Sequence, residues 1–72
     1  MKTLFSVKDL GVMVRAKRKQ DGLTQSDVAA FSGVGIRFVS ELERGKPTVR
    51  MDRILEVLNG LGLELVVKQR GE

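Results

Sequence analysis

The reactive groups in this 72-residue sequence are mainly cations. The sequence contains thirteen Lys and Arg residues and nine Asp and Glu residues, which gives a net charge of +4. Arg37 is the sharpest candidate, because an arginine can donate two parallel hydrogen bonds to guanine O6 and N7. Arg44 and Lys46 follow a few residues later, where a cation can bind a nucleic-acid phosphate. The alternative for all three is a solvated surface charge.

Composition argues against several other kinds of site. The sequence contains neither Cys nor His, which removes the commonest zinc ligands, thiol and imidazole catalysis, and any disulfide. No carboxylate cluster has metal-ligand spacing and no nucleophile lies beside a base, so we expect no cofactor and no enzyme. An apolar content of 42% indicates a folded chain. No apolar run approaches the ~20 residues that span a bilayer, and no secretory signal opens the chain, so we expect a cytoplasmic protein.

Four segments with helical apolar spacing must position these cations. The first helix is predicted to begin at Ser6 and to end at Gly22, and the second to begin at Thr24 with a capping box. The third covers about residues 36–44, and Thr48 is predicted to cap the fourth. The expected core residues lie on the inner faces: Leu10, Val14, Leu23, Val28, Ala29, Val34, Val39, Leu42, Ile54, Leu55 and Leu58.

A short turn around Gly33 separates the second and third helices. Residues 24–44 therefore have the spacing of a helix-turn-helix, whose second helix enters the DNA major groove. This recognition helix is predicted over about residues 36–44, which places Arg37 in its first turn. The free N–H groups that begin the second helix at Thr24 form a natural phosphate site.

The last segment changes from a helical to an alternating period, which predicts one β-strand. The sequence offers no second strand to pair with it, and a chain this short needs additional burial. We therefore expect the strand to pair with its own copy across a two-fold axis, with a solvated tail as the alternative. The residues expected to make this homodimer contact are Leu63, Leu65, Val66 and Val67.

Over about residues 10–61 the sequence resembles the XRE/Cro-type helix-turn-helix family. The resemblance is carried by Gly22-Leu23-Thr24-Gln25, Val28-Ala29, Gly33-Val34, Val39-Ser40 and Glu43-Arg44-Gly45-Lys46. A narrower resemblance, to the HipB-like antitoxins, is carried by RFVSELERGKPTVR at residues 37–50 and LGLEL at residues 61–65. One departure is Gly35, where many members have Ser or Thr as the helix cap.

The resemblance implies an all-α fold, a compact XRE-type domain of four to five helices with one C-terminal strand that pairs across a homodimer. Residues 1–5 would be a lead-in, residues 6–61 the DNA-binding domain, and residues 62–72 the dimerisation strand and tail. It also implies three groups of site residues. They are the base contacts Gly35, Ile36, Arg37 and Glu41, the phosphate contacts Thr24, Gln25, Ser40, Arg44 and Lys46, and a structural salt bridge between Arg18 and Glu43.

Two of these residues have open alternatives. Ile36 could touch a thymine methyl group or simply be exposed apolar surface. Glu41 lies one turn after Arg37, where it could orient the guanidinium, accept a hydrogen bond from cytosine N4, or be an ordinary surface charge.

The function that the resemblance implies is that of a sequence-specific transcriptional repressor. It would be the antitoxin of a type II toxin–antitoxin pair that binds a HipA-like kinase toxin and represses its own operon at a palindromic operator on double-stranded DNA. One alternative is a stand-alone repressor of the phage or restriction-modification kind. The other is a protein-interaction module that keeps the helix-turn-helix shape without reading DNA.

Overall fold

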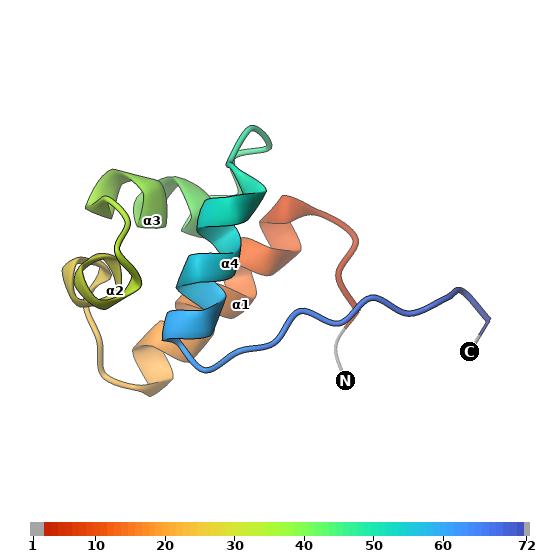
Figure 1. Cartoon of the computed structure of the whole chain (residues 1–72), viewed down its shortest axis with the longest axis horizontal. Coiled ribbons are helices and arrows are strands. Elements are labelled where there is room, and N and C mark those ends of the chain that lie inside the picture. Colours follow the sequence, from red (N-terminus) through yellow and green to blue (C-terminus); the bar gives the residue numbers. More distant parts are fainter. Residues whose placement is uncertain (1–2, 72) are drawn as a thin grey trace.

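Four helices make up the part of the chain that the computed structural model describes, residues 3–71 (Figure 1). They are α1 (Val7–Gln20), α2 (Gln25–Ser32), α3 (Ile36–Glu43) and α4 (Met51–Gly60). The predicted all-α class is confirmed. Residues 1 and 2 of the predicted lead-in and residue 72 of the predicted tail lie outside the described residues. No helix within residues 3–71 is long and apolar enough to cross a bilayer.

Local hydrogen bonds start the first two helices where the sequence predicts. At Thr24 a full capping box forms, because the Thr24 hydroxyl accepts from the Asp27 N–H at 3.0 Å and the Asp27 carboxylate accepts from the Thr24 N–H at 2.9 Å. At Ser6 the hydroxyl accepts from the Asp9 N–H at 3.2 Å. The Asp9 carboxylate accepts from the N–H of Phe5, one residue before the cap. The start of α2 is therefore the more tightly defined of the two.

The predicted cap of the fourth helix at Thr48 is wrong. The N-cap of α4 is Arg50, which has an extended backbone and no capping side-chain hydrogen bond. Residues 47–48 form a turn, and Val49 after them packs against the core. Arg50 pairs instead with Asp52, at 2.6 Å between Nη2 and Oδ2. Because the turn and the burial of Val49 come first, the helix starts later than the polar cap residue suggests.

The core forms where the inner stripes of the four helices meet. Leu55 is wrong as a predicted core residue, since it is 46% exposed. At ~100° per residue, the inner stripe of α4 runs through Ile54, Val57, Leu58 and Leu61, which leaves Leu55 on the outer face. The other predicted core residues are buried or packed against the core. The side chains that are fully enclosed are Val14, Val28, Val39, Leu42 and Val57.

α1 and α3 approach each other so closely at Gly11 that no side chain fits between them. A Cβ atom on Gly11 would lie 2.3 Å from the carbonyl oxygen of Leu42 and 2.9 Å from that of Glu43. Both oxygens belong to backbone at the end of α3, so they cannot move aside as a flexible side chain would. This contact sets the distance between α1 and the C-terminal end of α3.

After α4 the chain leaves the helical body as an extended arm that passes the N-terminal lead-in (Figure 1). Leu63 and Leu65 rest against the core, whereas Val66 and Val67 are 57% and 91% exposed. Within residues 3–71 the arm pairs with no other strand. Within that range the predicted C-terminal strand is therefore not formed, although the arm passes close to the lead-in.

Replacing Gly11 with alanine should destabilise the fold by about 1–3 kcal/mol, because the added methyl group overpacks the α1–α3 contact. The sign is diagnostic, since Ala in place of Gly inside a helix ordinarily stabilises by roughly 0.5–1 kcal/mol. Urea unfolding followed by circular dichroism measures the difference. Gly35→Ala is the control, because its Cβ meets open space, and it should cost less than about 1 kcal/mol. A G11A variant as stable as the parent chain would contradict the packing described.

Candidate nucleic-acid interface

α2 and α3 lie together at the end of the molecule opposite the C-terminal arm (Figure 1). Gly33 ends α2 with a left-handed backbone at φ 72°, which a residue with a side chain rarely adopts. Gly35 then begins α3 without a side-chain cap. Arg53 of α4 contacts this turn by donating a hydrogen bond from Nη1 to the Gly33 carbonyl oxygen at 3.4 Å. Arg53 could not be predicted from the sequence, because a contact across twenty residues leaves no local pattern.

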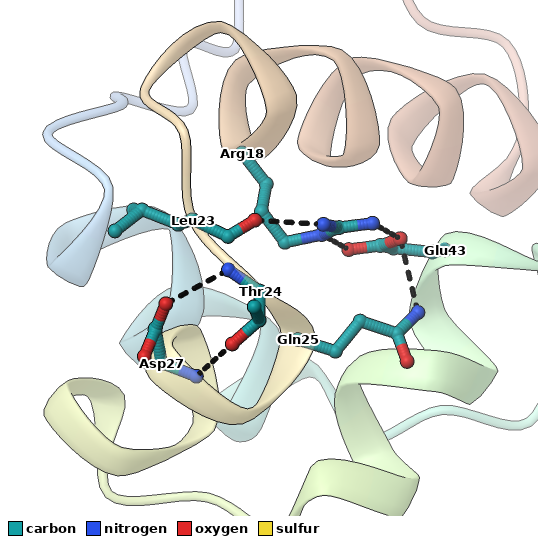
Figure 2. Close-up of polar contacts among 6 residues, drawn as sticks. All are labelled: Arg18, Leu23, Thr24, Gln25, Asp27 and Glu43. Carbon is teal, nitrogen blue, oxygen red and sulfur yellow. Dashed lines mark hydrogen bonds and ion pairs between the residues drawn. The ribbon is translucent and has the colours of Figure 1, made fainter.

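A bidentate ion pair joins α1 to the end of α3 (Figure 2). Arg18 donates from Nε to Glu43 Oε2 at 2.6 Å and from Nη2 to Glu43 Oε1 at 2.9 Å. The third nitrogen, Nη1, donates to the carbonyl oxygen of Leu23 at 2.8 Å, so the same guanidinium also fixes the chain that enters α2. Both side chains are withdrawn from solvent, with exposures of 11% for Arg18 and 3% for Glu43. The ion pair that the family resemblance implies between these residues is present in the structure.

Glu43 also receives a third hydrogen bond, from the side chain of Gln25 (Figure 2). The Gln25 amide nitrogen donates to Glu43 Oε1 at 3.1 Å. Gln25 is the first residue of α2, so this bond ties the start of α2 directly to the end of α3. The amide nitrogen keeps its second hydrogen, and the amide oxygen keeps its lone pairs. The family resemblance implies a phosphate contact for Gln25, and no local pattern in the sequence indicates this internal bond.

The ionisation of Glu43 reflects a competition between burial and these donors. Burial acts to raise the pKa of Glu43, because it disfavours the charged carboxylate. The hydrogen bonds from Arg18 and Gln25, together with the positive charges of Arg18 and Arg15, outweigh burial and leave the pKa below its ordinary value of 4.5. In turn, the hydrogen bond to Glu43 raises the pKa of Arg18. The pair is therefore fully ionised at neutral pH.

The start of α2 presents N–H groups beside Gln25. Thr24 and Asp27 cap each other there, and the Thr24 N–H bond to the carboxylate is the main reason that the pKa of Asp27 lies below its usual range (Figure 2). Both residues are exposed. The Thr24 hydroxyl oxygen accepts from Asp27, but its hydrogen remains available to a ligand.

The outer face of α3 begins with three exposed residues, Gly35, Ile36 and Arg37. Ile36 is 52% exposed, and the Arg37 side chain is 88% exposed. Arg37 Nε lies 3.6 Å from Glu41 Oε2, one helical turn further along. At 3.6 Å this contact is an ion pair longer than a hydrogen bond, and the exposed guanidinium carries the planar fork of donors that suits a guanine edge.

The predicted phosphate contacts after this face divide into two groups. Ser40 is half-buried in α3, whereas Arg44, the C-cap of α3, is exposed. Lys46 is already paired, because its Nζ donates to Glu41 Oε2 at 2.9 Å. The Lys46 hydrogen bond is the main reason that the pKa of Glu41 is lowered; burial opposes it, and the charges of Lys46, Arg37 and Arg44 add to it. Within residues 3–71 no group of three or more metal-ligating side chains is present.

Comparison with known proteins agrees with this architecture. A helix-turn-helix family model matches residues 14–67. An uncharacterized HTH-type transcriptional regulator from Sinorhizobium fredii, y4mF, is 42% identical over 64 residues, which cover 89% of this chain and 84% of the relative.

Solved structures with the same fold include chains from a HipB-O4 20mer complex and from a HipA-HipB-O2-O3 complex. Each superposes with a TM-score of 0.89 and 21% identity, and covers 97% of this chain and 99% of the other. A chain from a HipB-O1-O2 complex superposes with a TM-score of 0.87 at 22% identity, covering 96% of this chain and 100% of the other. At this level of identity the likeness establishes the fold.

Glu43→Gln should lower the free energy of unfolding by roughly 3–5 kcal/mol at pH 7, because it leaves the buried Arg18 charge without its counter-ion. Glu43 has a lowered pKa in the folded chain, so its contribution is fully present above about pH 4.5 and is lost as the pH falls through the folded value. The difference between the variant and the parent chain should therefore shrink below pH 4.5. Urea unfolding at a series of pH values measures both effects.

Two further variants control this experiment. Asp21→Asn removes an exposed ion pair with Lys17, whose atoms are 3.2 Å apart, and should cost less than about 1 kcal/mol. The double variant Arg18→Met/Glu43→Leu replaces the pair with apolar groups and should recover most of the loss. A double variant no more stable than E43Q, or a pH-independent difference, would show that the charge pair is not what holds α1 to α3.

Proposed function

We propose that this chain, which belongs to the helix-turn-helix family of transcriptional regulators, is a sequence-specific DNA-binding repressor that reads its operator with α3. The observation that carries the proposal is the exposed position of Arg37. Its side chain is 88% exposed in the first turn of α3, and the Glu41 carboxylate lies 3.6 Å from its Nε. An arginine presented in this way is suited to a bidentate contact with guanine in the major groove.

The residues beside Arg37 complete the base-reading surface that we propose. Gly35 has no side chain and would let the backbone come close to the DNA. Ile36 offers exposed apolar surface that fits a thymine methyl group. A contact from Glu41 to cytosine stays a prediction, because this carboxylate is paired with Lys46 and Arg37 in the free chain.

Phosphate contacts would flank this surface on both sides. At the start of α2, the backbone N–H groups of Gln25 and Ser26, which the capping box does not use, form one group of donors with the Thr24 hydroxyl and the second amide hydrogen of Gln25. Near the end of α3, Ser40, Arg44 and Lys46 form the other. Such contacts fix the register of a protein on the duplex, whereas base contacts select the sequence.

A homodimer would present two copies of α3 to successive major grooves of a palindromic operator. We propose that the extended arm after α4 pairs with its own copy as a β-strand, through the predicted residues Leu63, Leu65, Val66 and Val67. The exposure of Val66 and Val67 and the open backbone of the arm support this pairing. The outer face of α4, where Leu55 is 46% exposed, would add apolar area to the same contact.

We further propose that the chain is a HipB-like antitoxin whose partner is a HipA-like kinase toxin. The fold it shares with a chain from the HipA-HipB-O2-O3 complex supports this proposal. A stand-alone repressor would use the same DNA chemistry, so the reading frame beside the gene discriminates the two. A kinase of the HipA type encoded there favours the antitoxin.

The DNA-binding proposal predicts that the chain binds the duplex upstream of its gene more tightly than a scrambled duplex, with affinity that falls steeply as salt rises. Arg37→Ala should weaken binding to the upstream duplex by about 10- to 100-fold, the loss of one bidentate base contact, and weaken scrambled binding much less. Fluorescence anisotropy at several salt concentrations measures both. Arg70→Ala removes the same charge from the distal arm and serves as the control. Equal losses on the two duplexes would reduce Arg37 to a backbone contact.

The dimer proposal predicts a solution mass of two chains for the full-length protein. Val67→Asp places a charge in the proposed strand pair and should shift the mass toward one chain, because burying an unpaired carboxylate is costly. Ala16→Asp puts the same charge on the exposed side of α1 and should leave the dimer intact. Sedimentation equilibrium, with and without the upstream duplex, provides the measurement. Single chains in both conditions for the parent protein would exclude the scheme.

A further inference from the structure

One carboxylate oxygen in α3 holds two of the cations that the proposed function directs toward DNA. Glu41 Oε2 lies 2.9 Å from Lys46 Nζ and 3.6 Å from Arg37 Nε. The Glu41 side chain is only 18% exposed, whereas Lys46 is 48% exposed and Arg37 is 88% exposed. The carboxylate is therefore less exposed than either of the two cations with which it pairs.

The backbone fixes Lys46 in this position as well. Its N–H donates to the Glu41 carbonyl oxygen at 3.1 Å, so main chain and side chain of Lys46 bind the same residue. Gly45, between them in the turn, lies so close to α1 that a Cβ atom there would be 2.7 Å from Lys8 Cα. With this turn pinned against α1, the Lys46 ammonium meets the Glu41 carboxylate without any change of backbone.

We infer that Glu41 is a specificity-determining residue of the proposed DNA-binding surface, which it serves as an internal substitute for a phosphate. Its carboxylate is paired with Lys46 in the free chain, so a DNA phosphate that reaches Lys46 must compete with it for the charge of the ammonium. DNA of any sequence meets this competition. The same oxygen lies 3.6 Å from Arg37 Nε, close enough to orient a side chain that is 88% exposed and can reach a base. Glu41 thus lowers affinity for DNA in general and preserves the contact that depends on sequence. This inference rests on the proposed function.

Electrostatics gives the direction and scale of the effect. Each cation that becomes free to bind a phosphate makes affinity depend more steeply on salt, by roughly 0.9 in the slope of log K against log salt. Removing the Glu41 charge should therefore strengthen non-specific binding most, because that mode consists of phosphate contacts. Specific binding should gain less, because Arg37 loses the carboxylate that orients it.

The test compares the full-length chain with Glu41→Gln on the upstream duplex and on a scrambled duplex of equal length. E41Q should bind the scrambled duplex about three- to tenfold more tightly, with a salt slope steeper by about one. The ratio of specific to non-specific affinity should fall. Glu56→Gln is the matched control, because it removes the same charge from an α4 residue whose ion-pair partner, Arg53, lies 3.8 Å away. E56Q should change neither slope nor ratio.

A second pair of variants tests whether Glu41 acts through Lys46. In a Lys46→Met background, the gain in scrambled-duplex affinity caused by E41Q should largely disappear. An E41Q variant that loses affinity only for the upstream duplex would overturn the inference in favour of a cytosine contact. An unchanged ratio and slope would overturn it as well. A parent chain that binds neither duplex at low salt would instead overturn the proposed function, and the inference with it.

Discussion

The buried ion pair between Arg18 and Glu43 is the contact on which the remaining geometry depends. Through three nitrogens, one guanidinium binds the end of α3 and the chain entering α2. Glu43 in turn accepts a hydrogen bond from Gln25, the first residue of α2. A buried pair of this kind contributes little net stability, but removing one partner is costly. Its role here is orientation, because it fixes the end of α3 against α1.

Packing and charge act together in that orientation. Gly11 allows the backbones of α1 and α3 to come into contact, with room for no side chain between them. That approach brings Arg18, about two turns further along α1, within reach of Glu43. On the other side, Arg53 of α4 holds the turn that begins α3. The exposed face of α3 is therefore set by contacts from three other elements, which a short helix of eight residues could not supply alone.

The sequence predicts those features whose cause is local. Thr24 and Asp27 are three residues apart, and Gly33 stands where a left-handed backbone is needed, so α2 and its turn could be predicted. Thr48 is misleading because it lies in a turn, and Val49 after it packs against the core before α4 starts, which is a tertiary contact that no local pattern shows. In the candidate site, the Arg18–Glu43 pair followed from family resemblance, whereas the bonds of Glu43 to Gln25 and of Glu41 to Lys46 depend on three-dimensional placement.

The two glutamates of α3 show how one short helix can serve both the scaffold and a ligand surface. Glu41 and Glu43 are two residues apart, which separates their side chains by about 200° around the helix axis. Glu43 consequently faces α1 and is enclosed with Arg18, while Glu41 faces the cations on the outer side. A carboxylate at either position has its pKa lowered by the cations it meets, so both are charged at neutral pH. The first charge holds α3 in place, and the second limits the positive charge that α3 presents to any polyanion.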